Sequence, residues 1–143
     1  MSIQAILYNK GSSVVTIAPD ASVKAAADKL AEKKIAAVVV MDGDAILGLV
    51  SEREIVRAYA RFGVAIGGKT VRDIADADFI PVSPNDSLKR AMALMTEHRK
   101  RHLPVTKDGR LAGIVSLGDV VKHRLEDLEL ETNVLRDAYI AVH

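Results

Sequence analysis

The spacing of hydrophobic residues along the chain changes several times, and each change predicts a new element. Residues 14–17 are a short β-branched run that stops before Pro19, the pattern of a strand that leads into a turn. Apolar residues then recur at positions 23, 26, 27, 30 and 31, which is the spacing of a helix with one buried face. Either Asp20 or Ser22 can cap the start of this helix.

Two apolar runs on either side of a glycine turn predict a β-hairpin after this helix. The runs cover residues 37–41 and 46–50, and Gly43 lies in the turn between them. Both runs are apolar almost throughout, so both faces of the sheet are expected to be covered. A second helix, which carries Ile55 and Tyr59 on one face, follows the hairpin. The predicted order is therefore strand, helix, hairpin, helix.

This order of elements occurs twice. Residues 15–56 align with residues 80–121 at a constant offset of 65 without a gap, so that Ser51 matches Ser116. Two copies at so long a period indicate a duplicated unit of strands and helices, and not a solenoid. We expect a mixed α/β (α+β) fold with two β-α-β-β-α units in a pseudo-twofold tandem pair.

The chain is expected to divide after its first copy. The first unit, with an N-terminal segment and a linker, is predicted at residues 1–68. The second unit, with a C-terminal helical extension, is predicted at residues 69–143. Residues 63–69 contain two adjacent glycines, which favours a flexible link between the units.

The C-terminal extension carries a helical stripe that is too long for one small unit to cover. After Asp119 the chain has no glycine or proline, and apolar or small residues follow a spacing of four and three. The stripe consists of Val121, Leu125, Leu128, Thr132, Leu135 and Tyr139. Two outcomes stay open: the helix folds back on its own unit, or it packs on another subunit.

Composition excludes several classes of function. The chain has 143 residues with no cysteine, so thiol catalysis and thiolate metal sites are ruled out. Its 20 basic and 19 acidic residues leave a net charge of +1, which gives no bulk attraction to nucleic acid or membrane. No apolar run approaches the ~20 residues of a membrane span, and the first residues lack a targeting pattern. We expect a cytoplasmic protein.

The two aligned serines stand where a strand passes into a helix, and an acid follows three residues later. These acids are Glu54 and Asp119. A helix start presents unpaired N–H groups and a partial positive charge, which favour an anion, and the acid can accept hydrogen bonds from a diol. A phosphate site beside a diol site describes a nucleotide. The alternative is that Ser51 and Ser116 are ordinary helix caps, and that Ser51 and Glu54 form a capping box.

These paired junctions, the Arg-His-Leu-Pro-Val segment at residues 101–105 and the Ser-Glu-Arg-Glu segment at residues 51–54 resemble one known family. It is the tandem cystathionine β-synthase (CBS) domain family, whose two-domain unit is often called a Bateman module. The resemblance covers residues 12–125. It implies two β-α-β-β-α units joined through their sheets, commonly dimerised, with adenine nucleotides or related adenosyl ligands in the clefts between them.

The resemblance also implies which residues would contact a ligand. Asp119 would hold the ribose hydroxyls, Ser116 the phosphate, and Ile114 would line the base pocket. Arg101 and His102 would approach the phosphate and the base. The cleft would be closed by Ala18, Val23 and the backbone near Ala36 and Ala37, and a reciprocal cleft would use Leu49, Ser51, Glu54, Ser83 and Leu88. Glu54 departs from the family pattern, which has an aspartate there.

Other chemistry finds less support in the sequence. His98 and His102 could share a helix face as metal ligands, but no third ligand is evident and Pro104 forces an extended chain before it. The basic run at residues 98–102 could contact nucleic acid, but no stacking aromatic residues accompany it. No nucleophile motif or phosphate-binding loop of an enzyme is present.

The sequence therefore predicts a non-enzymatic regulatory module. Its ligand would be AMP, ADP, ATP, NAD or S-adenosylmethionine, with no catalytic cofactor and no metal. It would signal occupancy to an effector protein that the sequence does not identify, as a homodimer without contact to a membrane. Two alternatives remain: a structural dimerisation domain with vestigial clefts, and a weak nucleic-acid binder.

Overall fold

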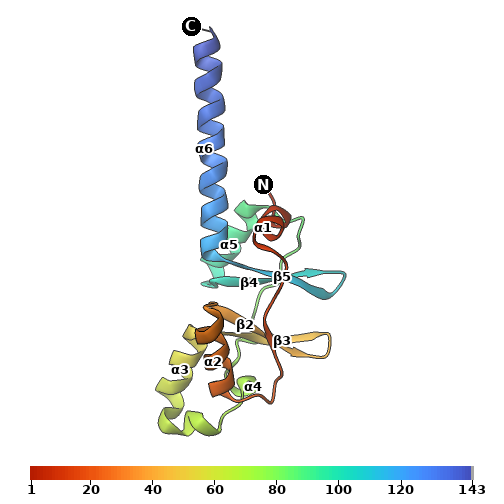
Figure 1. Ribbon diagram of the computed structural model, residues 1–143, viewed down its shortest axis with the longest axis vertical. Helices are drawn as coiled ribbons and strands as arrows, with labels where there is room; N and C mark the ends of the chain where they lie inside the picture. Colours follow the sequence, from red (N-terminus) through yellow and green to blue (C-terminus); the bar gives the residue numbers. More distant parts are fainter. Residues whose placement is uncertain (143) are drawn as a thin grey trace.

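The computed structural model describes residues 1–142 and shows two small α/β units stacked along the long axis, with one helix extending beyond them (Figure 1). In the first unit β1 (Thr16–Ile17) pairs in parallel with β2 (Ala37–Asp42), which pairs antiparallel with β3 (Ala45–Ser51). The second unit has the hairpin of β4 (His102–Lys107) and β5 (Arg110–Ser116). The predicted mixed fold of two repeated units is confirmed.

The helices of the two units begin and end alike. Helix α2 (Val23–Lys33) follows Ser22, whose Oγ accepts the Ala25 N–H at 3.0 Å, so Ser22 and not Asp20 is the cap. Helix α5 (Leu88–His98) follows Ser87 in the same way. Helix α3 (Glu52–Phe62) follows the first hairpin and continues into a short 3₁₀ helix, η1 (Gly63–Gly68), where the sequence predicted a flexible link.

The second copy of the first strand is reduced. In the first unit β1 is a two-residue strand, whereas the aligned segment of the second unit forms an isolated parallel bridge between Val82 and Val105. The Val82 N–H donates to the Pro104 carbonyl, and the Thr106 N–H donates to the Val82 carbonyl. The second sheet therefore keeps its third strand only as one residue.

Two short helices that the repeat alignment did not include complete the two units. Helix α4 (Val71–Ile74), from the linker, packs on the first unit, and helix α1 (Ile3–Lys10) packs on the second. The Val71 N–H donates to the Ala21 carbonyl at 2.9 Å. The Ile3 N–H donates to the Asp86 carbonyl, also at 2.9 Å, and Ala21 and Asp86 are 65 residues apart. Equivalent carbonyls of the two units thus anchor the two helices: α1, at the start of the chain, covers the second unit, and α4 covers the first.

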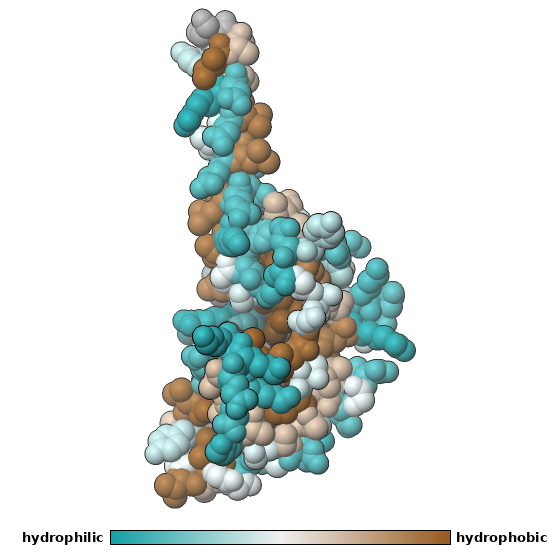
Figure 2. Space-filling view, in the orientation of Figure 1, coloured by the Kyte–Doolittle hydropathy of each residue, from teal (hydrophilic) through white to brown (hydrophobic). Residues whose placement is uncertain are grey.

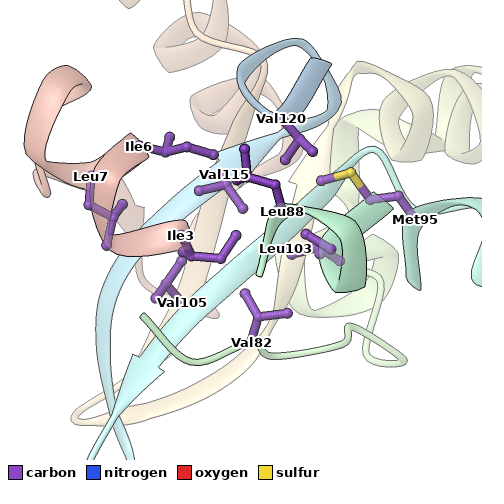
Figure 3. Close-up of a cluster of buried hydrophobic side chains, with 11 residues drawn as sticks. Ile3, Ile6, Leu7, Val82, Leu88, Met95, Leu103, Val105, Val115 and Val120 are labelled. Carbon is purple, nitrogen blue, oxygen red and sulfur yellow. The ribbon is translucent and has the colours of Figure 1, made fainter. Parts of the chain in front are cut away.

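The two hydrophobic cores do not follow the predicted division at residue 68. Figure 3 shows Ile3 and Ile6 of α1 lying against the strands and helices of the second unit. The second core consists of Ile3, Ile6, Leu7, Val82, Leu88, Ala91, Met95, Leu103, Val105, Val115 and Val120. The first core contains Val71 of α4 together with Ile17, Ala26, Leu30, Val38, Val40 and Val50. Residues 1–68 and 69–143 therefore describe the order of the copies along the chain, while the packing crosses between them.

The C-terminal extension is one continuous helix, α6 (Leu117–Val142), which leaves the body of the protein (Figure 1). Val120 and His123 are buried in its first two turns, and residues 128–141 are all exposed. The outcome in which this helix folds back on its own unit is wrong. Within residues 1–142 the second core takes Val120 from the first turn of α6, together with side chains of α1 and α5, and none from the rest of α6.

Candidate functional site

Both strand-to-helix junctions are capped as the sequence suggested. The Ser51 N–H and hydroxyl both donate to Glu54 Oε1, at 2.8 and 2.6 Å, and the pair forms a capping box. The Ser116 N–H donates to Asp119 Oδ2 at 2.9 Å, and the Asp119 N–H donates to Ser116 Oγ at 3.1 Å. The capping alternative is therefore confirmed for both serines, and one oxygen of each acid is already used in the protein.

A cleft of about 600 Å³ lies between the two units beside the first junction. One side comes from β3 and the start of α3, and the other from residues 100–102, just before and at the start of β4. Six of the residues that the sequence suggested line it: Ala36, Leu49, Ser51, Glu54, Arg101 and His102. The structure thus brings together side chains from both copies at one crevice.

The charged residues that line this cleft are four cations and three acids. Arg53, Arg57, Lys100 and Arg101 face three acids, Glu52, Glu54 and Asp76. Lys100 Nζ lies 2.7 Å from Asp76 Oδ2, and this ion pair joins the second unit to the linker. The Asp76 backbone is held against β3 by two hydrogen bonds with Leu49. Because Lys100 is paired with Asp76, the arginines are the cations best able to bind an anion.

A second contact also crosses between the units at this cleft. Arg53 Nη1 donates to the carbonyl of Arg99 at 2.7 Å. Arg99 ends α5 in the left-handed conformation with φ 54°. The start of α3 is therefore tied to the end of α5 through Arg53, and any ligand that draws this side chain toward itself acts on both units.

Arg53, Arg57, Lys100 and Asp76 were not among the residues chosen from the sequence. Arg53 and Arg57 are four apart in the helix that follows Ser51, so they lie on one face of its first two turns. That spacing was a usable signal. Asp76 carries no such signal, because it reaches the cleft only through the pairing of the linker with β3.

At the second junction the acid already forms an ion pair with a lysine. Lys10, the last residue of α1, places Nζ 2.6 Å from Asp119 Oδ2 and 3.1 Å from the Ile114 carbonyl oxygen. Partial burial acts to raise the pKa of Asp119, but the hydrogen bonds from Lys10 and Ser116 outweigh it and hold that pKa below its usual value. Asp119 is therefore ionised and paired within the protein.

Arg101 and His102 stand between the two junctions. His102 pairs with Ser116 in the second hairpin, and the Arg101 carbonyl accepts the Leu117 N–H at 2.8 Å. Their side chains nevertheless line the cleft beside Ser51 and Glu54, whereas the resemblance associated them with Asp119. Burial lowers the pKa of His102, although Glu54 and Asp119 act against it, so its ring is neutral at pH 7.

The remaining candidates do not line the 600 Å³ cleft. Val23 and Leu88 are buried at the starts of α2 and α5, and Leu88 belongs to the second core. Ser83 donates its N–H to Asp86 Oδ2 at 2.7 Å. Ala18 is exposed. Ala37 is buried opposite Ser51 in the first hairpin, and Ile114 is half-buried opposite Pro104 in the second. Their ligand contacts stay predictions.

Residues 1–142 contain neither a metal-binding cluster nor a membrane-spanning helix. No group of three or more His, Asp or Glu side chains in that range is arranged to hold a metal ion. None of the helices there has the length and apolar character needed to cross a membrane.

Comparisons with known proteins agree with the repeat. A protein-family model described as "CBS domain" matches twice, at residues 11–61 and 71–126. A protein of Arabidopsis thaliana named "CBS domain-containing protein CBSX3, mitochondrial" is 32% identical over 148 residues, which cover 97% of this chain and 71% of the relative.

Solved structures with the same architecture are similar in sequence too. The CBS-domain containing protein ATU1752 from Agrobacterium tumefaciens is 42% identical, with a TM-score of 0.83, over 86% of this chain and 92% of that one. A putative signal-transduction protein with CBS domains from Burkholderia ambifaria is 38% identical, with a TM-score of 0.84, over 89% of this chain and 96% of that one.

Proposed function

Because the chain belongs to the CBS-domain family, we propose that it is a non-enzymatic regulatory module that binds one adenine nucleotide between its two units. The observation that carries the proposal is the cleft of about 600 Å³, to which both copies contribute and which is lined by Arg53 and Arg57 of α3 and by Arg101 of the second unit. Most ligand pockets of small molecules and cofactors have a volume of this order. The candidate ligands are AMP, ADP, ATP, NAD and S-adenosylmethionine.

The lining of the cleft supplies a partner for each part of a nucleotide. Arg53, Arg57 and Arg101 would bind the phosphate, helped by the partial positive charge at the start of α3. The Ser51 hydroxyl already donates to Glu54, so it is not the main phosphate contact. Leu49 would provide an apolar wall for the base.

Glu54 can serve the ribose without losing its cap. Its Oε1 accepts both hydrogen bonds from Ser51, while Oε2 has no hydrogen bond within the described residues and belongs to a side chain that lines the cleft. A carboxylate oxygen in this position can accept from the two hydroxyls of a ribose. We therefore assign the ribose of the proposed ligand to Glu54.

The second junction is proposed as the weaker site. A ribose at Asp119 would have to displace Lys10, whose ammonium lies 2.6 Å from the carboxylate. The roles suggested for Ile114 and Ser116, with Ala18 and Val23 across from them, depend on the same displacement. One filled cleft per chain is the expected state.

Occupancy would be transmitted through the contacts that cross between the units. A phosphate near the start of α3 competes for Arg53, which holds the Arg99 carbonyl, and adds negative charge beside the Lys100–Asp76 ion pair. The relative position of the two units would then depend on the ligand. We propose that an effector protein senses this change, that the chain acts as a homodimer, and that it does so in the cytoplasm.

Isothermal titration calorimetry with each of the five candidate ligands tests the proposal. We expect at least one to bind at about one molecule per chain, and saturation at 100 times its dissociation constant to raise the free energy of unfolding by about 2.7 kcal/mol. Arg101→Ala should weaken this binding at least tenfold, about 1.4 kcal/mol, because it removes a charged phosphate partner. Arg110→Ala, at the exposed start of β5 away from the cleft, is the matched control.

Two results would count against this function. If no ligand binds to protein that mass spectrometry shows to be ligand-free, the cleft is vestigial and the structural alternative stands. If instead an oligonucleotide binds, with an affinity that falls steeply as salt increases, the basic segment at residues 98–102 is a nucleic-acid site.

A further inference from the structure

Helix α6 carries an exposed hydrophobic seam, in which Val121, Leu125, Leu128 and Leu135 are all exposed. Figure 2 shows brown, hydrophobic side chains along the part of α6 that extends from the body. Leu128 is 41% exposed and Leu135 is 72% exposed, so two large apolar side chains of this helix are in contact with water. An isolated helical segment of about 14 residues is only marginally stable in water, so a helix of this kind needs a packing partner.

The spacing of the seam is that of a coiled coil. Its residues are alternately four and three apart from Val121 to Tyr139, which assigns Val121, Leu128 and Leu135 to position d of a heptad. Leu125, Thr132 and Tyr139 then take position a. Leucine therefore occupies two of the three d positions, and Thr132 is the one β-branched residue at position a.

Charges beside the seam favour a parallel pair of identical helices. In such a pair position g of one helix meets position e of the other, five residues further on. Arg124 then meets Glu129 of the second copy, and Glu131 meets Arg136 of the second copy. Each contact joins opposite charges, and the twofold symmetry makes each occur twice.

An antiparallel pair that buries the same six seam positions has the opposite effect. Leu125 then packs against Leu135 of the second copy, and Glu129 faces Glu129 of the second copy. Lys122 faces Arg136 of the second copy, and Glu131 faces Glu131 of the second copy. Like charges at these flanking positions are destabilising, so the same sequence disfavours this orientation.

The body of the protein is consistent with the parallel arrangement. Helix α3 lies on the same side of the molecule as α6 in Figure 1 and exposes Val56 and Tyr59, at 67% and 60%. A parallel pair of α6 helices puts both bodies at the same end, where the two α3 helices can approach each other. An antiparallel pair puts them at opposite ends and leaves these side chains in water.

We infer that α6 pairs with α6 of a second copy of this chain as a parallel two-stranded coiled coil through Val121, Leu125, Leu128, Thr132 and Leu135. This gives the homodimer proposed above a specific interface, and it does not depend on whether a nucleotide binds. The two bodies are held side by side with their clefts at the same end.

The oligomeric state tests the seam. Light scattering after size exclusion should give twice the chain mass of 15.4 kDa for the full-length protein. Leu128→Glu with Leu135→Glu should halve that mass while the circular dichroism of the body persists, since both side chains are exposed within one chain. Leu130→Glu with Val134→Glu is the matched control, because these residues are on the same helix, 63% and 58% exposed, but outside the seam. A monomeric parent, a trimer or tetramer, or an equal effect of both pairs would overturn the inference.

Cysteine crosslinking tests the orientation. The chain has no cysteine, so a single introduced cysteine can form a disulfide only with the same residue of a second chain. In the parallel pair Leu128→Cys and Leu135→Cys both face themselves and should both form disulfide dimers under mild oxidation. Any antiparallel alignment can bring only one of these positions opposite itself, since they are seven residues, or about 10 Å, apart along the helix. Crosslinking of only one variant, or of neither, would exclude the parallel pair.

Discussion

Lys10 reaches the second junction from a helix that lies outside the recognised repeat. Its ammonium lies 2.6 Å from Asp119 Oδ2 and 3.1 Å from the Ile114 carbonyl oxygen, so both acceptors are already engaged within the protein. At the first junction no ion pair is formed with Glu54 by residues 1–142, and this side chain lines the open cleft. A single lysine therefore makes two homologous junctions unequal.

Removing Lys10 should open the second junction. Lys10→Ala is expected to raise the number of bound nucleotides per chain from one toward two in calorimetric titration, because Asp119 loses its competing partner. The partly exposed ion pair contributes only about 0.2 to 1 kcal/mol to stability, so the fold should persist. Lys24→Ala, which breaks an exposed pair with Asp28, is the control and should leave the stoichiometry unchanged. An unchanged stoichiometry in Lys10→Ala would show that Lys10 does not block the site.

His102 should make stability sensitive to mild acid. Its folded pKa lies below the ordinary 6.5 because of burial, so the unfolded chain takes up a proton first as the pH falls. Stability is then present above about pH 6.5 and is lost from there down to the folded pKa. The lowered pKa of Asp119 acts only in a more acidic range, below its ordinary 3.8.

The test compares thermal unfolding at about pH 7.5 and about pH 5.5. His102→Asn should lose less stability between these two pH values than the parent does. His98→Asn, at the half-exposed end of α5, should behave like the parent. If His102→Asn and the parent lose the same amount, the sensitivity arises from another group.

At the scale of elements, the repeated glycine of each hairpin explains how α4 and α1 are seated. A Cβ at Gly48 would lie 2.8 Å from the Asp76 carbonyl oxygen and 2.9 Å from Ala75 Cβ. A Cβ at Gly113 would lie 2.6 Å from Leu7 Cδ2. The same position in each copy thus admits a neighbouring segment, the linker in one case and α1 in the other.

Substitutions of these glycines should therefore differ in cost. Gly48→Ala is expected to lower the free energy of unfolding by about 1 to 3 kcal/mol, because backbone atoms of the linker must move. Gly113→Ala should cost less, since the Leu7 side chain can change its rotamer. Gly67→Ala, which meets nothing within 4 Å, is the control and should be neutral or slightly stabilising. Chemical denaturation measures all three, and equal costs for Gly48→Ala and Gly67→Ala would contradict the close packing.

At the scale of the whole molecule, the two units are joined by the exchange of their covering helices. The chain starts with α1 on the second unit, passes through the first unit, and returns with α4 on the first before it enters the second (Figure 1). The cleft forms where the two units meet, and the Lys100–Asp76 and Arg53–Arg99 contacts bridge the same boundary. The cleft and both bridging contacts therefore depend on how the two units are placed relative to each other.

The sequence by itself determined the local structure and the duplication. Hydrophobic period, β-branched runs and capping serines are local signals, so the hairpins, α2, α3, α5 and the caps at Ser51 and Ser116 were all predictable from neighbouring residues. The offset of 65 was visible because side chains at matched positions fill the same places in two cores.

Only the tertiary structure decided how these parts meet. The seating of α1 on the second unit, the hold of Lys10 on Asp119, and the gathering of Arg101 and His102 beside Glu54 join residues that are distant in the chain. Hydrophobic periodicity does not report such contacts, because it depends on neighbouring residues and these contacts join distant ones. The direction of α6 is likewise decided by tertiary packing, since only its first turns contribute buried side chains to the body.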